Sequence, residues 1–312
     1  MAAAFVTGPN GSGPRLVVVL GPTATGKSDL AVELALRLGG EVLNADAMQL
    51  YRGMDIGTAK LSLAERRGVP HHLLDVLDIT ENASVAAFQR EARALVERLL
   101  DAGRVPVLVG GSALYLRSVL DEMTFPGTDP AVRARLEAEL ATEGPAVLHQ
   151  RLACLDPAAA AAVLVSNGRR IVRALEVIEI TGQAFSGRLP ELGEPRYGAV
   201  LLGLELPTEA LDQRIEERVR RMFEAGLVDE VRQLLEYGLR DGRTASRAVG
   251  YQQVLDALDT DGDLDRAEAD TVRATRRLVR RQRSWFRRDP RIRWLDGLDD
   301  PVSSALGVLA GR

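Results

Sequence analysis

The amino-acid sequence predicts an α/β fold with a parallel sheet and an inserted helical segment. Short apolar runs rich in β-branched residues alternate with stretches of helical periodicity, and a glycine-rich motif joins the first run to the first helix. Between residues 121 and 197 this alternation gives way to helical patterns rich in Ala, Arg and Glu. We therefore expect a core formed by residues 1–120 and 198–312, with a helical insertion at residues 121–197.

Four apolar runs are the predicted strands of the core. They are residues 15–20, 41–45, 105–109 and 199–206. The second run ends at Asp46 and the third at Gly110, while helical periodicity begins at Ser28, covers residues 85–102 and dominates from the last strand to Trp285. Because parallel sheets bind ligands at the carboxyl ends of their strands, the residues that follow these runs are the candidates for a site.

A phosphate-binding motif of the form G-x-x-x-x-G-K-[ST] lies between the first strand and the first helix. Its residues are Gly21, Pro22, Thr23, Ala24, Thr25, Gly26, Lys27 and Ser28. Glycines let backbone N–H groups converge on phosphate oxygens, and the helix N-terminus adds the positive end of its dipole. We expect this P-loop to hold a diphosphate, with Lys27 on the distal phosphate and Ser28 as a ligand of Mg²⁺. The core is accordingly P-loop NTPase-like.

The second acid of an ordinary ATPase or GTPase is missing from its usual place. Such enzymes hold their metal with an acid at the end of a buried strand, but residues 105–109 lead into Gly110, Gly111 and Ser112. The nearest acid at a strand end is Asp46, which could act as general base while an acceptor attacks and pyrophosphate leaves. A kinase whose Asp46 binds an acceptor hydroxyl, or a simple turn cap, would fit the same position.

Composition restricts the classes of protein that the chain can represent. Its 312 residues, 46% of them hydrophobic, can bury a large core, and no apolar run reaches the roughly 18 residues of a membrane span. The start of the chain lacks the pattern of a secretion signal, and the single cysteine, Cys154, excludes an internal disulfide. We expect a cytoplasmic monomer with no membrane partner.

Arginine carries nearly all of the positive charge, since only Lys27 and Lys60 among the 40 basic residues are lysines. A lysine kept in such a chain indicates that its compact ammonium group is needed there. At a net charge of −4, a nucleic acid would have to be bound by local basic patches.

Three groups of arginines are candidates for such patches. They are Arg169 with Arg173, Arg214 with Arg218, and the arginines of residues 273–293 around Trp285 and Phe286. Helical spacing aligns the members of the first two pairs, and the mixture of charge and aromatic rings in the third suits RNA. A solvated, salt-bridged helix face is the alternative for each group.

Two of the three histidines, His71 and His72, are adjacent. No further ligand cluster accompanies them, so we expect them to make structural hydrogen bonds and not to bind a metal.

Several different motif blocks are spread over almost the whole chain. They lie at residues 21–28, 46–60, 70–75, 109–115, 169–177, 214–222, 248–251, 274–277 and 281–287. The stretch from Tyr51 to Lys60, YRGMDIGTAK, is not a general P-loop feature. Together these blocks resemble the bacterial tRNA dimethylallyltransferases.

The resemblance implies a reaction and a set of roles. The family transfers a dimethylallyl group from its diphosphate to the exocyclic amine of the adenosine just 3′ of a tRNA anticodon, with Mg²⁺. By resemblance, the Thr23 hydroxyl lies near the bridging oxygen of the diphosphate, Asp46 is the base and Arg218 clamps the leaving pyrophosphate. The residues that the resemblance assigns to tRNA are Asp46, Ala47, Met48, Gln49, Ser112, Arg133, Arg169, Arg170, Ile171, Val172 and Arg173, the last six in the insertion that would grip the anticodon stem.

Asn44 and Ala47 differ from the family pattern, in which Ser is frequent at both positions, so we expect a hydroxyl contact beside Asp46 to be missing. Two other enzyme classes remain alternatives. An isopentenyltransferase of free adenine nucleotides would not need the insertion, and a P-loop kinase would consume ATP.

Overall fold

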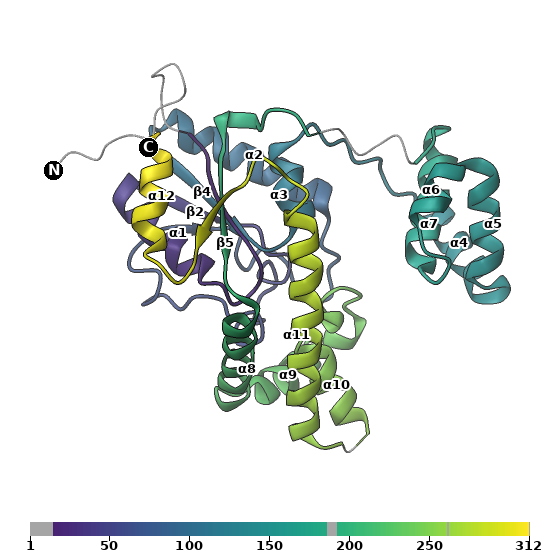
Figure 1. Ribbon diagram of the computed structural model, residues 1–312. Helices are drawn as coiled ribbons and strands as arrows, with labels where there is room; N and C mark the ends of the chain where they lie inside the picture. The colour runs from purple at the N-terminus through teal and green to yellow at the C-terminus, as the bar shows by residue number, and fades with distance from the viewer. Residues whose placement is uncertain (1–14, 186–191, 261, 312) are drawn as a thin grey trace. The chain divides into compact units, whose positions relative to one another are not determined.

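The structure, a computed structural model, describes residues 15–185, 192–260 and 262–311 (Figure 1). The chain divides into two compact units. The larger unit runs to Leu120 and resumes at Glu194, and the smaller unit covers Asp121–Gly193. In the part of the chain that the structure describes, no helix is both long and apolar enough to cross a lipid bilayer.

A six-stranded parallel sheet forms the centre of the larger unit. Its order is β3-β2-β4-β1-β5-β6, with β1 at Val17–Leu20, β2 at Gly40–Asn44, β3 at His71–His72, β4 at Val105–Gly110, β5 at Val200–Glu205 and β6 at Arg293–Asp296. Four of these strands are the predicted apolar runs. The other two lie at the edges of the sheet and escaped prediction, because β3 has two residues and three of the four residues of β6 are exposed.

Helices cover both faces of this sheet, which explains why the central strands are mainly apolar. Alternate side chains of β1 point to opposite faces. Leu16, Val18 and Leu20 join the core beneath α2 (Val85–Asp101) and α3 (Ala113–Leu120). Val17 and Val19 pack with α1 (Lys27–Leu38) and α12 (Pro301–Leu309).

A second group of helices follows the carboxyl end of β5. It comprises α8 (Thr208–Glu224), α9 (Leu227–Glu236), α10 (Tyr251–Asp259) and α11 (Leu264–Phe286). Figure 1 shows α8 and α11 side by side below the sheet, and they share a small core that includes Ile215, Val219 and Val279. These helices therefore stand at the sheet edge where ligands are expected.

The smaller unit is a bundle of four helices with a core of its own. Its helices are α4 (Pro130–Glu143), α5 (Pro145–Leu155), α6 (Pro157–Ala162) and α7 (Gly168–Thr181). Asp129, Asp156 and Asn167 accept backbone N–H groups at the starts of α4, α6 and α7, and three of the four helices begin with Pro, which suits the first helical position.

Candidate active site

The P-loop joins β1 to α1 as a closed turn. Gly21 must be glycine, because a Cβ there would lie 2.5 Å from the carbonyl oxygen of Leu204 on β5. The carbonyl of Pro22 accepts hydrogen bonds from Thr25 Oγ1 at 2.9 Å and Lys27 Nζ at 2.5 Å. Gly26 at the start of α1 is left-handed and has no side chain to cap the helix. The first N–H groups of α1 are thus available to an anion.

Two cations and one carboxylate influence one another at this loop. Burial, together with the charge of Arg218, lowers the pKa of Lys27 to about 7, and the charge of Asp46 opposes this shift. Burial also lowers the pKa of Arg218, again against the effect of Asp46. A bound anion such as a diphosphate would relieve the repulsion between the two cations. Lys27 of the P-loop, Asp46 and Arg218 thus lie near enough for their charges to act on one another.

Asp46 stands just beyond β2 and is held there by Asn44. The buried Asn44 amide accepts from Asp46 N–H at 2.8 Å and donates to the Asp46 carbonyl at 3.0 Å and the Leu73 carbonyl at 2.9 Å. Asp46 Oδ1 itself accepts from Met48 N–H at 2.9 Å, so the carboxylate also caps a turn. Asn44, which stands where serine is frequent in the family, thus binds both the backbone N–H and the backbone carbonyl of Asp46.

The end of β4 approaches Asp46 closely. In the register of the sheet Asn44 pairs with Val109, and a Cβ on Gly110 would lie 2.7 Å from the Ala45 carbonyl oxygen. Ser112 follows, half-buried, and its carbonyl accepts from Leu116 N–H in the first turn of α3. Since β2 and β4 are neighbours, Asp46 and Ser112 lie at adjacent strand ends.

The side chains of Lys60 and Gln49 hold the loop after Asp46 in place. Lys60, almost fully buried, donates to the Tyr51 carbonyl at 3.0 Å, Asp55 at 2.5 Å and Asp75 at 2.6 Å. This three-way contact explains why a lysine is kept at this position. The amide of Gln49 donates to the carbonyls of Thr58 and Ala59 at 3.1 and 3.4 Å. Gln49 therefore shapes the loop in this structure.

Glu230 of α9 holds the same loop from the other side. Its carboxylate accepts from the backbone N–H groups of Asp55, Ile56 and Gly57, at 2.7 to 3.2 Å, and from the hydroxyl of Tyr251 at 2.5 Å. Arg218 donates to the carbonyl of Thr58 in this loop at 3.4 Å. Ala47 and Met48, also predicted to meet tRNA, are partly buried against the cores of the larger unit.

The residues predicted to contact tRNA in the smaller unit fall into two classes. Arg169 and Arg170 are exposed at the start of α7, whereas the side chains of Ile171 and Val172 are buried in the core of the bundle and cannot reach RNA there. The prediction of RNA contact through those two side chains is corrected by this burial. The periodicity of an amphipathic helix explains the division.

Arg133 and Arg173 are engaged with the buried carboxylate of Glu176. Arg133 donates to both Glu176 oxygens, and Arg173 Nη1 donates to Glu176 Oε2 at 2.9 Å. Arg173 also donates to the carbonyls of Pro126 and Gly127 at 2.8 and 3.1 Å. Their ion pairs therefore fasten α4 and the preceding segment to α7.

The third arginine group is only partly available as a stacking and charged surface. Phe286 packs inside the core of the larger unit and is 4% exposed, so its prediction as a surface ring is wrong. Trp285 is 47% exposed, with the Arg288 guanidinium 5.8 Å from its ring centre. Arginines that pair with acidic residues include Arg273, Arg276, Arg283, Arg287 and Arg291.

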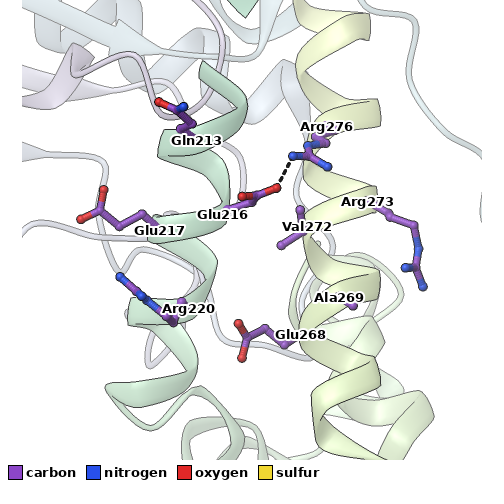
Figure 2. Close-up of a pocket in the computed structure, with 9 residues that line it drawn as sticks. All are labelled: Gln213, Glu216, Glu217, Arg220, Glu268, Ala269, Val272, Arg273 and Arg276. Atoms are coloured by element: carbon purple, nitrogen blue, oxygen red, sulfur yellow. Dashed lines mark hydrogen bonds and ion pairs between the residues drawn. The ribbon is translucent and has the colours of Figure 1, made fainter. Parts of the chain in front are cut away.

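An open groove of about 580 Å³ runs between α8 and α11 (Figure 2). Its charged side chains are Glu216, Glu217, Arg220, Glu268, Arg273 and Arg276. Arg276 pairs with Glu216 across it, as Figure 2 shows. The charges balance, and none of the residues predicted to hold the diphosphate or to act as base lines this groove, so we assign it no catalytic role.

The adjacent histidines make local contacts. His71 Nδ1 lies 2.8 Å from the Val69 carbonyl and His72 Nε2 2.7 Å from Glu41. Across residues 15–185, 192–260 and 262–311 there is no group of three or more His, Cys, Asp or Glu side chains that could hold a metal ion.

Comparison with known proteins identifies the family. The model of a family described as IPP transferase matches residues 49–289. The chain belongs to the IPP transferase family. A tRNA dimethylallyltransferase of Saccharopolyspora erythraea is 67% identical over 291 residues, covering 93% of this chain and 94% of the relative. One of Streptomyces griseus is 63% identical over 289 residues, covering 93% and 92%.

Solved structures of IPP transferases have the same fold. A tRNA isopentenylpyrophosphate transferase of Bacillus halodurans, 40% identical, has a TM-score of 0.70 and covers 95% of both chains. A eukaryotic dimethylallyltransferase described as acting on tRNA, 27% identical, has a TM-score of 0.80 and covers 95% of this chain and 80% of that one. The predicted P-loop NTPase-like α/β fold is thereby confirmed.

The match to the IPP transferase model begins after the P-loop and Asp46, so the roles of those residues rest on the geometry described above. Sequence reasoning assigned no role to Glu230 or Gln282, although both contact the site from distant helices. Gln282 lies within a motif block of the resemblance, which was the only signal for it. Glu230 carried no signal, because the backbone groups that it binds in the site lie some 170 residues earlier.

Proposed function

We propose that this IPP transferase moves a dimethylallyl group from dimethylallyl diphosphate to the exocyclic amine of the adenosine just 3′ of a tRNA anticodon, releasing pyrophosphate. The family and the names of the relatives support tRNA as acceptor. The observation that carries the reaction is the acid Asp46 at a strand end, near enough to Lys27 of the P-loop and to Arg218 for the charges to act on one another.

The chemistry follows from these groups. The adenine N6 lone pair attacks C1 of the dimethylallyl group, the C1–O bond breaks, and its electron pair leaves on the bridging oxygen as pyrophosphate. The attacking nitrogen becomes acidic as the new bond forms, and Asp46 takes its proton. Backbone N–H groups of the P-loop, the Thr23 hydroxyl, Lys27 and Arg218 would stabilise the charge on the departing oxygen.

Mg²⁺ fits the residues at the start of α1 in a limited way. Ser28, half-buried, offers one hard oxygen ligand, and Mg²⁺ commonly takes its other ligands from substrate phosphates and water. When bound, the ion would neutralise part of the pyrophosphate charge. Lys27 and Arg218 are the protein's own positive groups for neutralising the rest of the pyrophosphate charge.

For the acceptor, we propose that the target adenosine leaves the anticodon loop, at a cost of roughly a few kcal/mol, and meets Asp46, Ser112 and the loop of residues 47–49. The smaller unit would grip the anticodon stem, with Arg169 and Arg170 as its exposed basic residues. Donor and base residues come from one unit of one chain, and the acceptor is tRNA, so we expect a monomer that works in the cytoplasm.

Mass spectrometry of nucleosides tests the proposal. Purified protein is incubated with tRNA, Mg²⁺ and dimethylallyl diphosphate, and the digested tRNA is searched for prenylated adenosine. Asp46→Asn, which removes the base and keeps the shape, serves as the matched control and should give little adduct. If no tRNA carrying adenosine at that position gains the adduct, the proposal is wrong.

The same assay separates the alternatives. An isopentenyltransferase of free nucleotides would prenylate adenine nucleotides without tRNA. A kinase would release ADP from ATP in step with acceptor and would form no pyrophosphate from the prenyl donor.

A further inference from the structure

A single glutamine links the P-loop to the end of β4. Gln282, on the last turns of α11, accepts from the backbone N–H of Thr23 through Oε1 at 2.9 Å. Its Nε2 donates to the carbonyl of Gly111, also at 2.9 Å. Because one partner can only donate and the other can only accept, the orientation of the amide is determined.

The space around this amide is narrow. A Cβ on Gly111 would lie 2.5 Å from Gln282 Nε2 and 3.5 Å from the carbonyl oxygen of Gly21. The ends of β1 and β4 therefore come close together at this point, with the glutamine amide bridging them. A side chain at position 111 would displace the Gln282 amide from this place.

Helix α11 is seated firmly on either side of Gln282. Val279 is buried against α8 and Phe286 in the core under the sheet. Arg283 donates to the carbonyl of Leu206 and to Thr208 Oγ1 at the end of β5. The glutamine is thus presented to the strand ends by a helix that cannot rotate freely.

The two loops that Gln282 joins serve the two substrates in the function proposed above. Thr23 belongs to the diphosphate loop, and Ser112, directly after Gly111, is expected to meet the target nucleotide. Transfer needs the reacting nitrogen and carbon about 3–3.5 Å apart, and a displacement of about 1 Å can lower the rate about 10²-fold. We propose that Gln282 is a positioning residue that holds the diphosphate loop and the acceptor turn at the separation required for transfer. This inference rests on the proposed function.

Two substitutions test the positioning role. Gln282→Met keeps the length of the side chain and removes both hydrogen bonds, so kcat for tRNA prenylation should fall about 10–100-fold while KM for donor and tRNA each change less than about threefold. Gln282→Glu keeps an acceptor for Thr23 N–H, loses the donor to Gly111 and adds a negative charge beside the diphosphate loop. It should lower kcat and also raise the inhibition constant of pyrophosphate.

Gln252→Met on the exposed face of α10 is the matched control and should behave as wild type. Prenylation by wild type and by this control tests the proposed function itself, so a failure there is distinct from a failure of the inference. The inference is overturned if Gln282→Met keeps the wild-type kcat, or if its loss lies in KM alone.

A purely structural role would lower the melting temperature of Gln282→Met and leave kcat per folded enzyme unchanged, which would also overturn the inference. Should Gln282→Met fail to fold, hydrogen exchange at the Thr23 amide of the wild-type protein decides. We expect protection of that amide, and exchange at the rate of a free amide would contradict the contact on which the inference depends.

Discussion

Replacing Glu176 by glutamine should loosen the smaller unit. The Glu176 carboxylate is fully buried and receives hydrogen bonds from Arg133 and Arg173, which donate from α4 and α7. Burial disfavours its charge, but the two guanidinium groups outweigh burial and hold the pKa of Glu176 below its usual value of 4.5. The charged carboxylate is therefore the stable form at neutral pH, and Glu176→Gln removes that charge from between two cations.

The size of the effect follows from the exposure of the partners. Breaking a buried ion pair costs about 3–5 kcal/mol, and the side chains of Arg133 and Arg173 are 32% and 28% exposed. Water can still solvate these two arginines in part, so we expect a loss of stability at the lower end of this range, about 3 kcal/mol. Hydrogen exchange of peptides from α4 and α7 in the full chain should then accelerate about 10²-fold, provided that exchange reports opening of the bundle.

Glu179→Gln is the matched control on the same helix. Glu179 pairs with Arg135 at 2.6 Å, with both side chains about 40% exposed, and its loss should cost about 0–1 kcal/mol. Equal exchange rates in the two variants would refute the reasoning. The sign of the pH dependence is also determined. Because the pKa of Glu176 is lower in the folded state, its stabilising contribution is present above pH 4.5 and is lost as the pH falls through the folded-state pKa.

The remaining predictions concern the donor site and the basic residues of α7. Asp46→Ala should lower the single-turnover rate about 10²–10⁴-fold with little change in tRNA affinity; a rate near wild type would leave Asp46 as a turn cap only. Arg169→Ala should reduce the slope of log tRNA affinity against log salt concentration by about one unit at most, and an unchanged slope would mean that Arg169 only faces solvent. Arg173→Ala should chiefly accelerate hydrogen exchange in α7. Lys27→Ala and Arg218→Ala should each reduce donor turnover strongly, with ATP acting at most as a competitive inhibitor, and tRNA-dependent ADP release would contradict this.

The periodicity of the sequence was enough to predict the central sheet and the loop that it carries. β1, β4 and β5 are mainly apolar because helices cover both faces, and β2 has an apolar centre between Glu41 and Asn44; such runs can be recognised without knowing the fold. The edge strand β6 escaped because it is short, exposed and set among arginines. Asp46 could be placed because it directly follows a predicted strand.

The ion-pair partners of the arginines were harder to predict than the helix faces on which they lie. Helical spacing aligns Arg169 with Arg173, yet only the structure shows that Arg173 is bound to Glu176 and to two carbonyls while Arg169 is exposed. Glu176 lies three residues after Arg173, so this pairing was open to prediction. Arg133, which comes from another helix, was not.

Phe286 shows how a helical period could have corrected a surface assignment. Val279 and Phe286 are seven residues apart and therefore share a face of α11, and both are buried. An aromatic ring seven residues from a buried valine on the same helix is expected to lie in the core. Trp285, one position away, is exposed as that period requires.

Arg218 and Gln282 reach the site because of the way their helices, α8 and α11, pack. On α8, Ile215 and Val219 are buried against α11, which leaves Arg218 on the flank that meets Thr58 and influences Lys27. On α11, Val279 packs against α8, and one turn later Gln282 reaches both strand-end loops. Sequence patterns show which face of a helix is buried, but not which element packs against it. The contacts of Arg218 and Gln282 with the site could therefore not be derived from residue spacing. The contacts that complete the site are thus consequences of how α8 and α11 pack under the sheet, and substitutions in their shared core should disturb catalysis without touching a substrate.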